Sequence, residues 1–152
     1  MSKKESAGIL VYRYRQQHPE FFLVHMGGPF WKNKEKGAWT IPKGEIPEEE
    51  DGLTTARREF REETGFDLPG PFTPLNPIKQ AGGKIVNAWA CQADLDPTAI
   101  NSNVFSIEWP PKSGRKQSFP EVDRAAWMTK EEAEGRIISA QLKLLQQIPD
   151  KT

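Results

Sequence analysis

The stretch GEIPEEEDGLTTARREFREETGF spans residues 44–66, and about half of its side chains are charged. Residues 53–64 contain good helix formers and no proline, and Gly65 follows at the position of a C-terminal cap. At about 100° per residue, Leu53, Ala56 and Phe60 lie on one side of such a helix. The pattern therefore predicts a helix whose apolar side packs against the rest of the protein.

Three glutamates, Glu59, Glu62 and Glu63, are related by steps of three and four residues and share a neighbouring arc of this helix. Ionised carboxylates at this spacing repel one another. A hard divalent cation with oxygen ligands removes the repulsion, which makes the arc a candidate metal site. The alternative is a solvated surface helix, in which these acids pair with the arginines of the same helix.

The loop before the helix favours the metal site. The sequence PKGE at residues 42–45 predicts a sharp turn, and Gly44 permits a backbone carbonyl group to approach a metal ion closely. Residues 48–50 are three further glutamates. A solvated surface helix requires neither feature, so the loop and the helix together indicate a functional site.

Residues 44–66 resemble the Nudix box, G-x5-E-x7-R-E-U-x-E-E-x-G-U, where U is a bulky aliphatic or aromatic residue. Every specified position is matched at the required spacing, which makes this motif far more specific than a lone glycine-rich pattern. The matching residues are Gly44, Glu50, Arg58, Glu59, Phe60, Glu62, Glu63, Gly65 and Phe66. The resemblance implies a Nudix hydrolase, and with it an α/β fold of the Nudix-type α/β/α sandwich with a mixed β-sheet.

The resemblance also implies a role for individual residues. Metal ligands are expected to be Glu59, Glu62 and Glu63, with the Gly44 carbonyl group. Arg58 would orient the box glutamates through hydrogen bonds and complete the catalytic set, and Glu50 would act likewise. A further carboxylate from outside the box is expected near a strand end; Glu121 is preferred to Glu108, because a basic loop precedes it. The general base is not assigned, since a box carboxylate and a carboxylate from a later loop both satisfy the requirement.

Hydrolysis of a phosphoanhydride requires neutralised phosphate oxygens and an activated water, and divalent cations held by carboxylates supply both. A ligand set of oxygen atoms suits Mg²⁺, with Mn²⁺ as an alternative. Cysteine and histidine are absent from the acidic stretch, which argues against zinc.

Further strands are predicted around this helix from β-branched and aromatic runs and from turn signals such as Gly82-Gly83. The basic segment 110–116, with two prolines, is expected to be a mobile excursion. Thr129 predicts a helix N-cap, and apolar spacing predicts a final helix. The predicted strands cover residues 7–14, 21–26, 39–42, 72–75, 78–80, 84–93, 104–109 and 121–127, and the final helix covers residues 139–148.

Substrate contacts are predicted on both sides of the acidic stretch. In the loop 27–39, Phe30 and Trp31 are placed to stack on a base, with neighbouring lysines for phosphates. The alternative is that these aromatics cover the edge of the core. Trp39 and Lys43 belong to a W-x-x-P-K-G segment that resembles the corresponding segment of Nudix enzymes acting on diadenosine or diphosphoinositol polyphosphates. Arg115 is expected to close over substrate phosphates.

Length and composition predict a single domain over residues 1–152. The formal net charge is zero, which does not favour binding to nucleic acid or to an anionic membrane. The N-terminal MSKKESAG has no apolar core for a signal peptide, and Cys91 is the single cysteine, so a cytoplasmic protein is expected. The expected partner is a small-molecule nucleotide, and the expected assembly is a monomer or a weak homodimer.

Three functions remain open from the sequence. The first is hydrolysis of a nucleoside diphosphate-linked substrate, with a diadenosine polyphosphate such as diadenosine tetraphosphate preferred. The second is another Nudix activity, directed at nucleoside triphosphates, ADP-ribose or diphosphoinositol polyphosphates. The third is a non-catalytic nucleotide-binding Nudix module, which the intact acidic pair Glu62-Glu63 disfavours.

Overall fold

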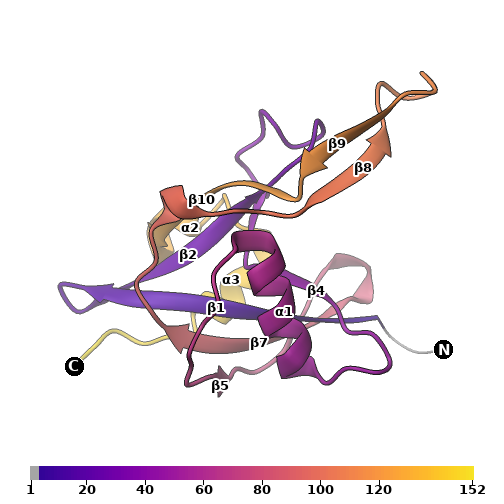
Figure 1. Ribbon diagram of the computed structural model, residues 1–152. Helices are drawn as coiled ribbons and strands as arrows, with labels where there is room; N and C mark the ends of the chain where they lie inside the picture. Colours follow the sequence, from indigo (N-terminus) through magenta and orange to yellow (C-terminus); the bar gives the residue numbers. More distant parts are fainter. Residues whose placement is uncertain (1–3) are drawn as a thin grey trace.

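A mixed β-sheet organises the protein in the computed structural model, which describes residues 4–152 (Figure 1). Residues 1–3 lie outside the described part. They begin the N-terminal segment MSKKESAG, which was predicted not to be a signal peptide. The main strand order is β10-β2-β1-β7-β5, while the short strands β3, β4 and β6 pair with β2, β1 and β7. The strands of this sheet are β1 (Glu5–Arg15), β2 (His18–Met26), β3 (Trp39–Thr40), β4 (Lys43–Glu45), β5 (Thr73–Pro74), β6 (Ile78–Lys79), β7 (Ile85–Gln92) and β10 (Val122–Thr129).

Helical segments cover both faces of this sheet. They are α1 (Gly52–Thr64), the 3-10 turns η1 (Ala81–Gly83), η2 (Pro97–Ala99) and η3 (Ser139–Gln141), and the short helices α2 (Lys130–Ala133) and α3 (Leu142–Leu145). Figure 1 shows α1 in front of the sheet and the C-terminal segment behind it. No helix among residues 4–152 has the length and apolar character needed to cross a membrane.

Alternation along β1 builds two cores, because successive side chains of a strand point to opposite faces. Ile9 and Val11 pack with Phe60 of α1 on one face, and Leu10 packs with Leu144 and Leu145 on the other. Strands β1 and β7 run parallel, and the other pairings of the sheet are antiparallel. The predicted α/β/α sandwich with a mixed sheet is therefore confirmed.

Helix α1 ends where its sequence predicts and begins one residue earlier, at Gly52, with an N-cap that was not predicted. The Asp51 side chain accepts a hydrogen bond from the Thr54 N–H at 2.8 Å, which satisfies one free donor of the first turn. Gly65 adopts a left-handed conformation with φ of 82°, and its N–H donates to the Arg61 carbonyl oxygen. Phe60 is buried as expected, whereas Leu53 is only partly covered.

The C-terminal region differs from the predicted long helix over residues 139–148. Thr129 caps α2 in a capping box with Glu132, but this helix lasts for only four residues. The final segment consists of η3 and the four-residue α3. Leu145 and Ile148 are nevertheless buried, so the predicted apolar stripe packs into the core without a regular helix.

A separate antiparallel hairpin, formed by β8 (Val104–Glu108) and β9 (Lys116–Pro120), extends away from α1 in Figure 1. The mobile excursion was predicted to extend over residues 110–116, but Lys116 already belongs to β9 and pairs with Glu108. Strand β9 was not predicted, because its sequence KQSFP has only one large apolar side chain.

Candidate active site

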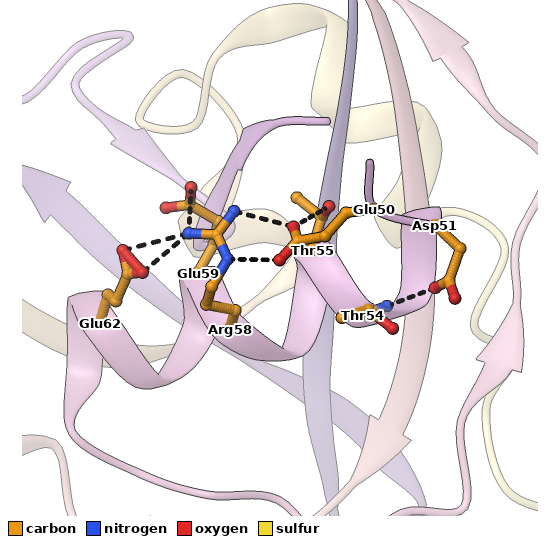
Figure 2. A network of polar contacts seen from close by, with 7 residues as sticks. All are labelled: Glu50, Asp51, Thr54, Thr55, Arg58, Glu59 and Glu62. Atoms are coloured by element: carbon orange, nitrogen blue, oxygen red, sulfur yellow. Dashed lines mark hydrogen bonds and ion pairs between the residues drawn. The ribbon is translucent and has the colours of Figure 1, made fainter. Parts of the chain in front are cut away.

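Arg58 lies at the centre of a network of carboxylates on α1 and on the loop before it (Figure 2). Its Nε donates to Oε2 of Glu50 and its Nη2 donates to Oε1 of Glu50, both at 3.0 Å. Its Nη1 donates to Glu62 at 2.8 Å and to Glu59 at 3.4 Å. One guanidinium therefore holds three carboxylates, two of which are predicted metal ligands.

Glu50 is fixed by more than the ion pair. The Thr55 hydroxyl donates to Oε1 of Glu50 at 2.6 Å. The hydrogen bonds from Arg58 and Thr55 lower the pKa of Glu50, so this carboxylate stays ionised and holds the guanidinium. Because Thr55 is buried against the sheet, the network is tied to the folded core.

Glu63 occupies the least accessible position of the cluster, with only 5% of its surface exposed. It accepts a hydrogen bond from the backbone N–H of Lys43, at the start of β4. Burial, together with the carboxylates of Glu59 and Glu121, raises the pKa of Glu63 to about 9. A buried carboxylate beside two others is costly when ionised, and a bound cation is the usual way to offset that cost.

Glu121 reaches the same cluster from the segment between β9 and β10. The Asn103 N–H donates to the carbonyl oxygen of Glu62 at 2.8 Å, and the Glu121 N–H donates to the carbonyl oxygen of Asn103 at 2.9 Å. These two bonds connect Glu121 to the C-terminal part of α1. Burial and the neighbouring Glu62 raise the pKa of Glu121, and burial and Glu62 likewise raise that of Glu59. The carboxylates therefore interact across two elements that are distant in the sequence.

Gly44 is in close contact with the side chain of Glu59. A Cβ atom built at position 44 would overlap the Glu59 carboxyl group and would lie 2.7 Å from its Cγ. Only glycine leaves room for this carboxylate against the β4 backbone. The predicted metal ligands Gly44 and Glu59 are thus neighbours in the structure.

The donor atoms suit a hard divalent cation, since they are carboxylate oxygens and a backbone carbonyl group. Among residues 4–152, however, no three acidic, histidine or cysteine side chains converge closely enough to form a ready metal site. The ion pair between Arg58 and Glu62 explains this, because it directs the Glu62 carboxylate toward the guanidinium. Glu62 would have to leave Arg58, at least in part, to join Glu59 and Glu63 around an ion.

The predicted substrate contacts are divided between exposed and half-buried positions. Lys43 is half-buried near the cluster, where burial and the nearby Lys84 lower its pKa. Phe30 is 59% exposed, and its ring contacts Trp109 edge-on, with the centroids 5.2 Å apart. Trp31 is partly buried against the core, and the Lys34 ammonium lies 5.4 Å from its ring centroid.

Two predicted substrate residues have positions that do not support that role. Trp39 is 4% exposed and lies in the core, because β3 pairs with β2 and directs the indole toward the C-terminal segment. Its ring contacts His25 edge-on. Arg115 directly precedes β9, at the turn of the β8–β9 hairpin, which extends away from α1 (Figure 1), because β9, which was not predicted, pairs with β8.

Several residues that shape the site were missed in the sequence. Asn103 positions Glu121, and Thr55 supports Glu50, yet neither stands out in a single sequence. Trp109 and Gln117 connect the two strands of the hairpin near its turn. The Gln117 side-chain amide donates to the Trp109 carbonyl oxygen at 2.9 Å. The alternation of Phe105, Ile107 and Trp109 was the available signal, but its partner strand was not recognised.

A family model described as the NUDIX domain matches residues 3–148. The chain belongs to the Nudix family. The predicted family is therefore confirmed, and the Glu-rich helix α1 is the helix of its Nudix box. No curated protein matches the sequence.

Solved structures of other Nudix proteins share this fold at low sequence identity. The NUDIX domain of Shewanella oneidensis NrtR, complexed with ADP ribose, is 17% identical in sequence and superposes with a TM-score of 0.66. The match covers 97% of this chain and 86% of the NrtR chain. A Caenorhabditis elegans Ap4A hydrolase in a binary complex is 21% identical, with a TM-score of 0.61 and 93% of both chains covered. At these identities the likeness establishes the fold alone.

A further structure, of Shewanella oneidensis NrtR complexed with a 27mer DNA, is 17% identical with a TM-score of 0.58. The match covers 93% of this Nudix chain and 58% of that chain. The prediction that this protein binds no nucleic acid is therefore not confirmed by its relatives.

Proposed function

We propose that this Nudix protein is a metal-dependent hydrolase that cleaves a phosphoanhydride bond in a nucleoside diphosphate-linked substrate. The observation that carries the proposal is the acidic cluster around Arg58. The loop before α1, α1 itself and the residue between β9 and β10 bring five carboxylates together, and Glu63 among them is buried. The nearby cations are Arg58 and Lys43, which leaves an excess of negative charge that favours a divalent cation.

We assign the ligand role to Glu59, Glu62, Glu63 and Glu121 with the Gly44 carbonyl group. A bound Mg²⁺ or Mn²⁺ supplies neutralisation of the phosphate oxygens and activation of water. Arg58, held by Glu50, limits the positions available to the Glu59 and Glu62 side chains. A carboxylate of the cluster accepts the proton of the attacking water as the new P–O bond forms. The bridging P–O bond breaks, and the leaving group departs with the bridging oxygen.

Among substrates, we propose a diadenosine polyphosphate such as diadenosine tetraphosphate. The exposed Phe30 and the neighbouring Trp109 provide aromatic surface for a base, while Lys32 and the half-buried Lys43 carry positive charge for phosphates. The likeness to the Caenorhabditis elegans Ap4A hydrolase is in keeping with this choice, although it concerns the fold. We also propose that residues 1–152 act as one domain.

The test is product analysis by chromatography with Mg²⁺ and a panel of substrates. The panel contains diadenosine tetraphosphate, nucleoside triphosphates, ADP-ribose and a diphosphoinositol polyphosphate, with Glu63→Gln as the inactive control. ATP and AMP as products, formed from the dinucleotide faster than any other product, support the proposal. Faster turnover of another substrate overturns the substrate assignment and retains the hydrolase. Absence of turnover in a folded protein that binds Mg²⁺ overturns the enzymatic proposal.

A further inference from the structure

The β8–β9 hairpin presents one apolar face and one polar face. Phe105, Ile107, Trp109 and Phe119 are half-buried, whereas the intervening side chains of β8 are exposed. The rings of Phe105 and Phe119 face each other across the two strands, with their centroids 6.1 Å apart. An isolated two-stranded hairpin is marginally stable in water, so this face requires a partner.

The partner is the start of the loop after β2. A Cβ atom on Gly28 would lie 2.8 Å from the Phe105 ring, and the Gly27 N–H donates to the Glu121 carbonyl oxygen at 2.8 Å. The two glycines therefore let the loop backbone pass directly beneath the hairpin. Further along the loop the two segments separate and enclose a cleft of about 500 Å³.

The lining of this cleft combines flat apolar walls with hydrogen-bonding groups. Trp109 and Phe119 contribute aromatic surface, and Asn33 and Gln117 contribute side-chain amides. The Gln117 Nε2 donates to the Trp109 carbonyl oxygen, so Oε1 of the same amide provides an acceptor. Lys32 adds a positive charge at the same cleft. A pocket of a few hundred Å³ with these groups has the size and chemistry of a site for a planar heterocycle.

A buried histidine holds the floor of the cleft in place. Asp123 lines the cleft, and its Oδ1 lies 2.8 Å from Nδ1 of the fully buried His25. The other ring nitrogen of His25 donates to the Lys34 carbonyl oxygen at 2.6 Å. His25 thereby connects β10 to the loop that forms the opposite wall. These two hydrogen bonds fix the position of one wall relative to the other.

The cleft is adjacent to the acidic cluster. Pro120 lines the cleft, and the next residue is Glu121, whose carboxylate interacts with Glu59, Glu62 and Glu63. The wall of the cleft at Pro120 is therefore one residue along the chain from a carboxylate of the acidic cluster. A nucleotide with its nucleobase in the cleft would extend its phosphates toward these carboxylates. Lys32 is the cation in the cleft available to these phosphates.

We propose that this cleft, between residues 28–33 and the β8–β9 hairpin, is the nucleobase subsite of the protein, with Trp109 stacking on the base and Gln117 binding its edge. The proposal rests on the proposed function for the identity of the ligand as a nucleoside. Trp109 and Gln117 are then specificity-determining residues that lie outside the Nudix box.

A larger cleft of about 600 Å³ is less suited to this role. It lies beside the C-terminal ends of β1 and β7 and is lined by Arg13, Tyr14 and Asp94 among others. Arg13 already donates to Asp94 at 2.8 Å and to Glu20 at 2.9 Å, so its charge is paired within the protein. The Lys151 ammonium lies 5.8 Å from the Tyr14 ring centroid.

The test is titration of the full chain with adenosine, followed by NMR, with ribose as the comparator that lacks a base. We expect adenosine to shift the Trp109 indole N–H and the Gln117 side-chain amide signals. Trp109→Ala is expected to weaken adenosine binding by about fivefold to a hundredfold, which is the range for loss of one base-stacking ring. Ser106→Ala, on the polar face of the same hairpin, is the matched control and is expected to bind adenosine normally.

This experiment separates the subsite from the hydrolase. Adenosine shifts at the Gln117 amide that weaken or disappear in Trp109→Ala support the subsite even when the product analysis finds no turnover. Equal shifts with ribose, or unchanged adenosine affinity in Trp109→Ala, overturn it even when diadenosine tetraphosphate is hydrolysed. Circular dichroism of each variant establishes that the fold is retained; if Trp109→Ala unfolds, Trp109→Leu and Gln117→Ala replace it, and unchanged adenosine affinity in both overturns the subsite.

Discussion

Arg58 binds Glu50 through two parallel N–H groups, with both donor–acceptor distances at 3.0 Å, and it turns its third nitrogen toward Glu59 and Glu62. Glu50 thus fixes the guanidinium from the loop side, and the guanidinium positions two carboxylates of α1. The fork geometry of arginine is required for this, because a lysine ammonium cannot bind Glu50 in a bidentate manner while reaching Glu62.

Replacement of Arg58 by lysine is therefore expected to lower turnover, by about tenfold to a hundredfold, as for other residues that orient metal ligands. The measurement is kcat and the Mg²⁺ concentration at half-maximal rate. Arg61→Lys, at an exposed position of the same helix, is the matched control. Equal activity of the two variants would contradict the positioning role of Arg58.

Gly44→Ala is expected to abolish most of the activity, because the new methyl group would overlap the Glu59 carboxyl group. The same overlap destabilises the fold, by about 1–3 kcal/mol for an overpacked site. The double variant Gly44→Ala/Glu59→Ala removes the overlap and is expected to recover stability without activity. Urea unfolding of the four proteins gives the coupling energy. Additive effects of the two changes would show that Gly44 acts independently of Glu59.

The sequence predicted the helix, its C-terminal cap Gly65 and the acidic side chains that the helix carries, because these depend on local spacing within residues 44–66. It also predicted the layered fold, through the resemblance of residues 44–66 to the Nudix box, and the two cores on either side of β1 agree with it. Trp39 was misjudged, because its neighbours in the sequence do not reveal that β3 pairs inside the sheet.

The cleft beside the hairpin was beyond prediction for a similar reason. Strand β9 has weak local signals, and Trp109 becomes a wall of the cleft only when β8 pairs with β9. Asn103 likewise acquires its role from two backbone hydrogen bonds with residues of other elements. Contacts between distant segments determine these features, so a single sequence carries little information about them.

The raised pKa of Glu63 predicts a specific pH dependence of stability in the metal-free protein. Between the ordinary pKa of 4.5 and the folded value of about 9, the folded protein holds a proton that the unfolded chain has released. Stability therefore falls as pH rises through this window. At pH 8 in EDTA, Glu63→Gln is expected to be more stable than the wild type, by an amount on the order of a few kcal/mol.

Urea unfolding at pH 5 and pH 8 measures this effect, with Glu49→Gln at an exposed position as the control. The stability advantage of Glu63→Gln is expected to be much smaller at pH 5, because pH 5 lies only just above the ordinary pKa of 4.5, around which the unfolded chain releases the proton. An advantage that does not depend on pH would contradict the raised pKa. Saturating Mg²⁺ is expected to reverse the order of stability, because Glu63 is then a ligand that the variant lacks.

Glu63→Gln is also expected to lower turnover by orders of magnitude, since glutamine has nearly the shape of glutamate but no charge to hold a cation. The measurement is the initial rate of nucleotide hydrolysis at saturating substrate and Mg²⁺. A variant with the native circular dichroism spectrum and full activity would show that the site assignment is wrong.

His25 provides the final prediction, because it is fully buried and bonds through both ring nitrogens to groups on different segments. His25→Ala leaves the Asp123 carboxylate and the Lys34 carbonyl group without these partners, so it is expected to cost about 3 kcal/mol of stability. The loop that carries Phe30 loosens, and KM is expected to rise more than kcat falls. His18→Ala, at an exposed histidine, is the control, with both variants followed by thermal unfolding and steady-state kinetics. A stable His25→Ala variant with normal KM would show that the loop is held by other contacts.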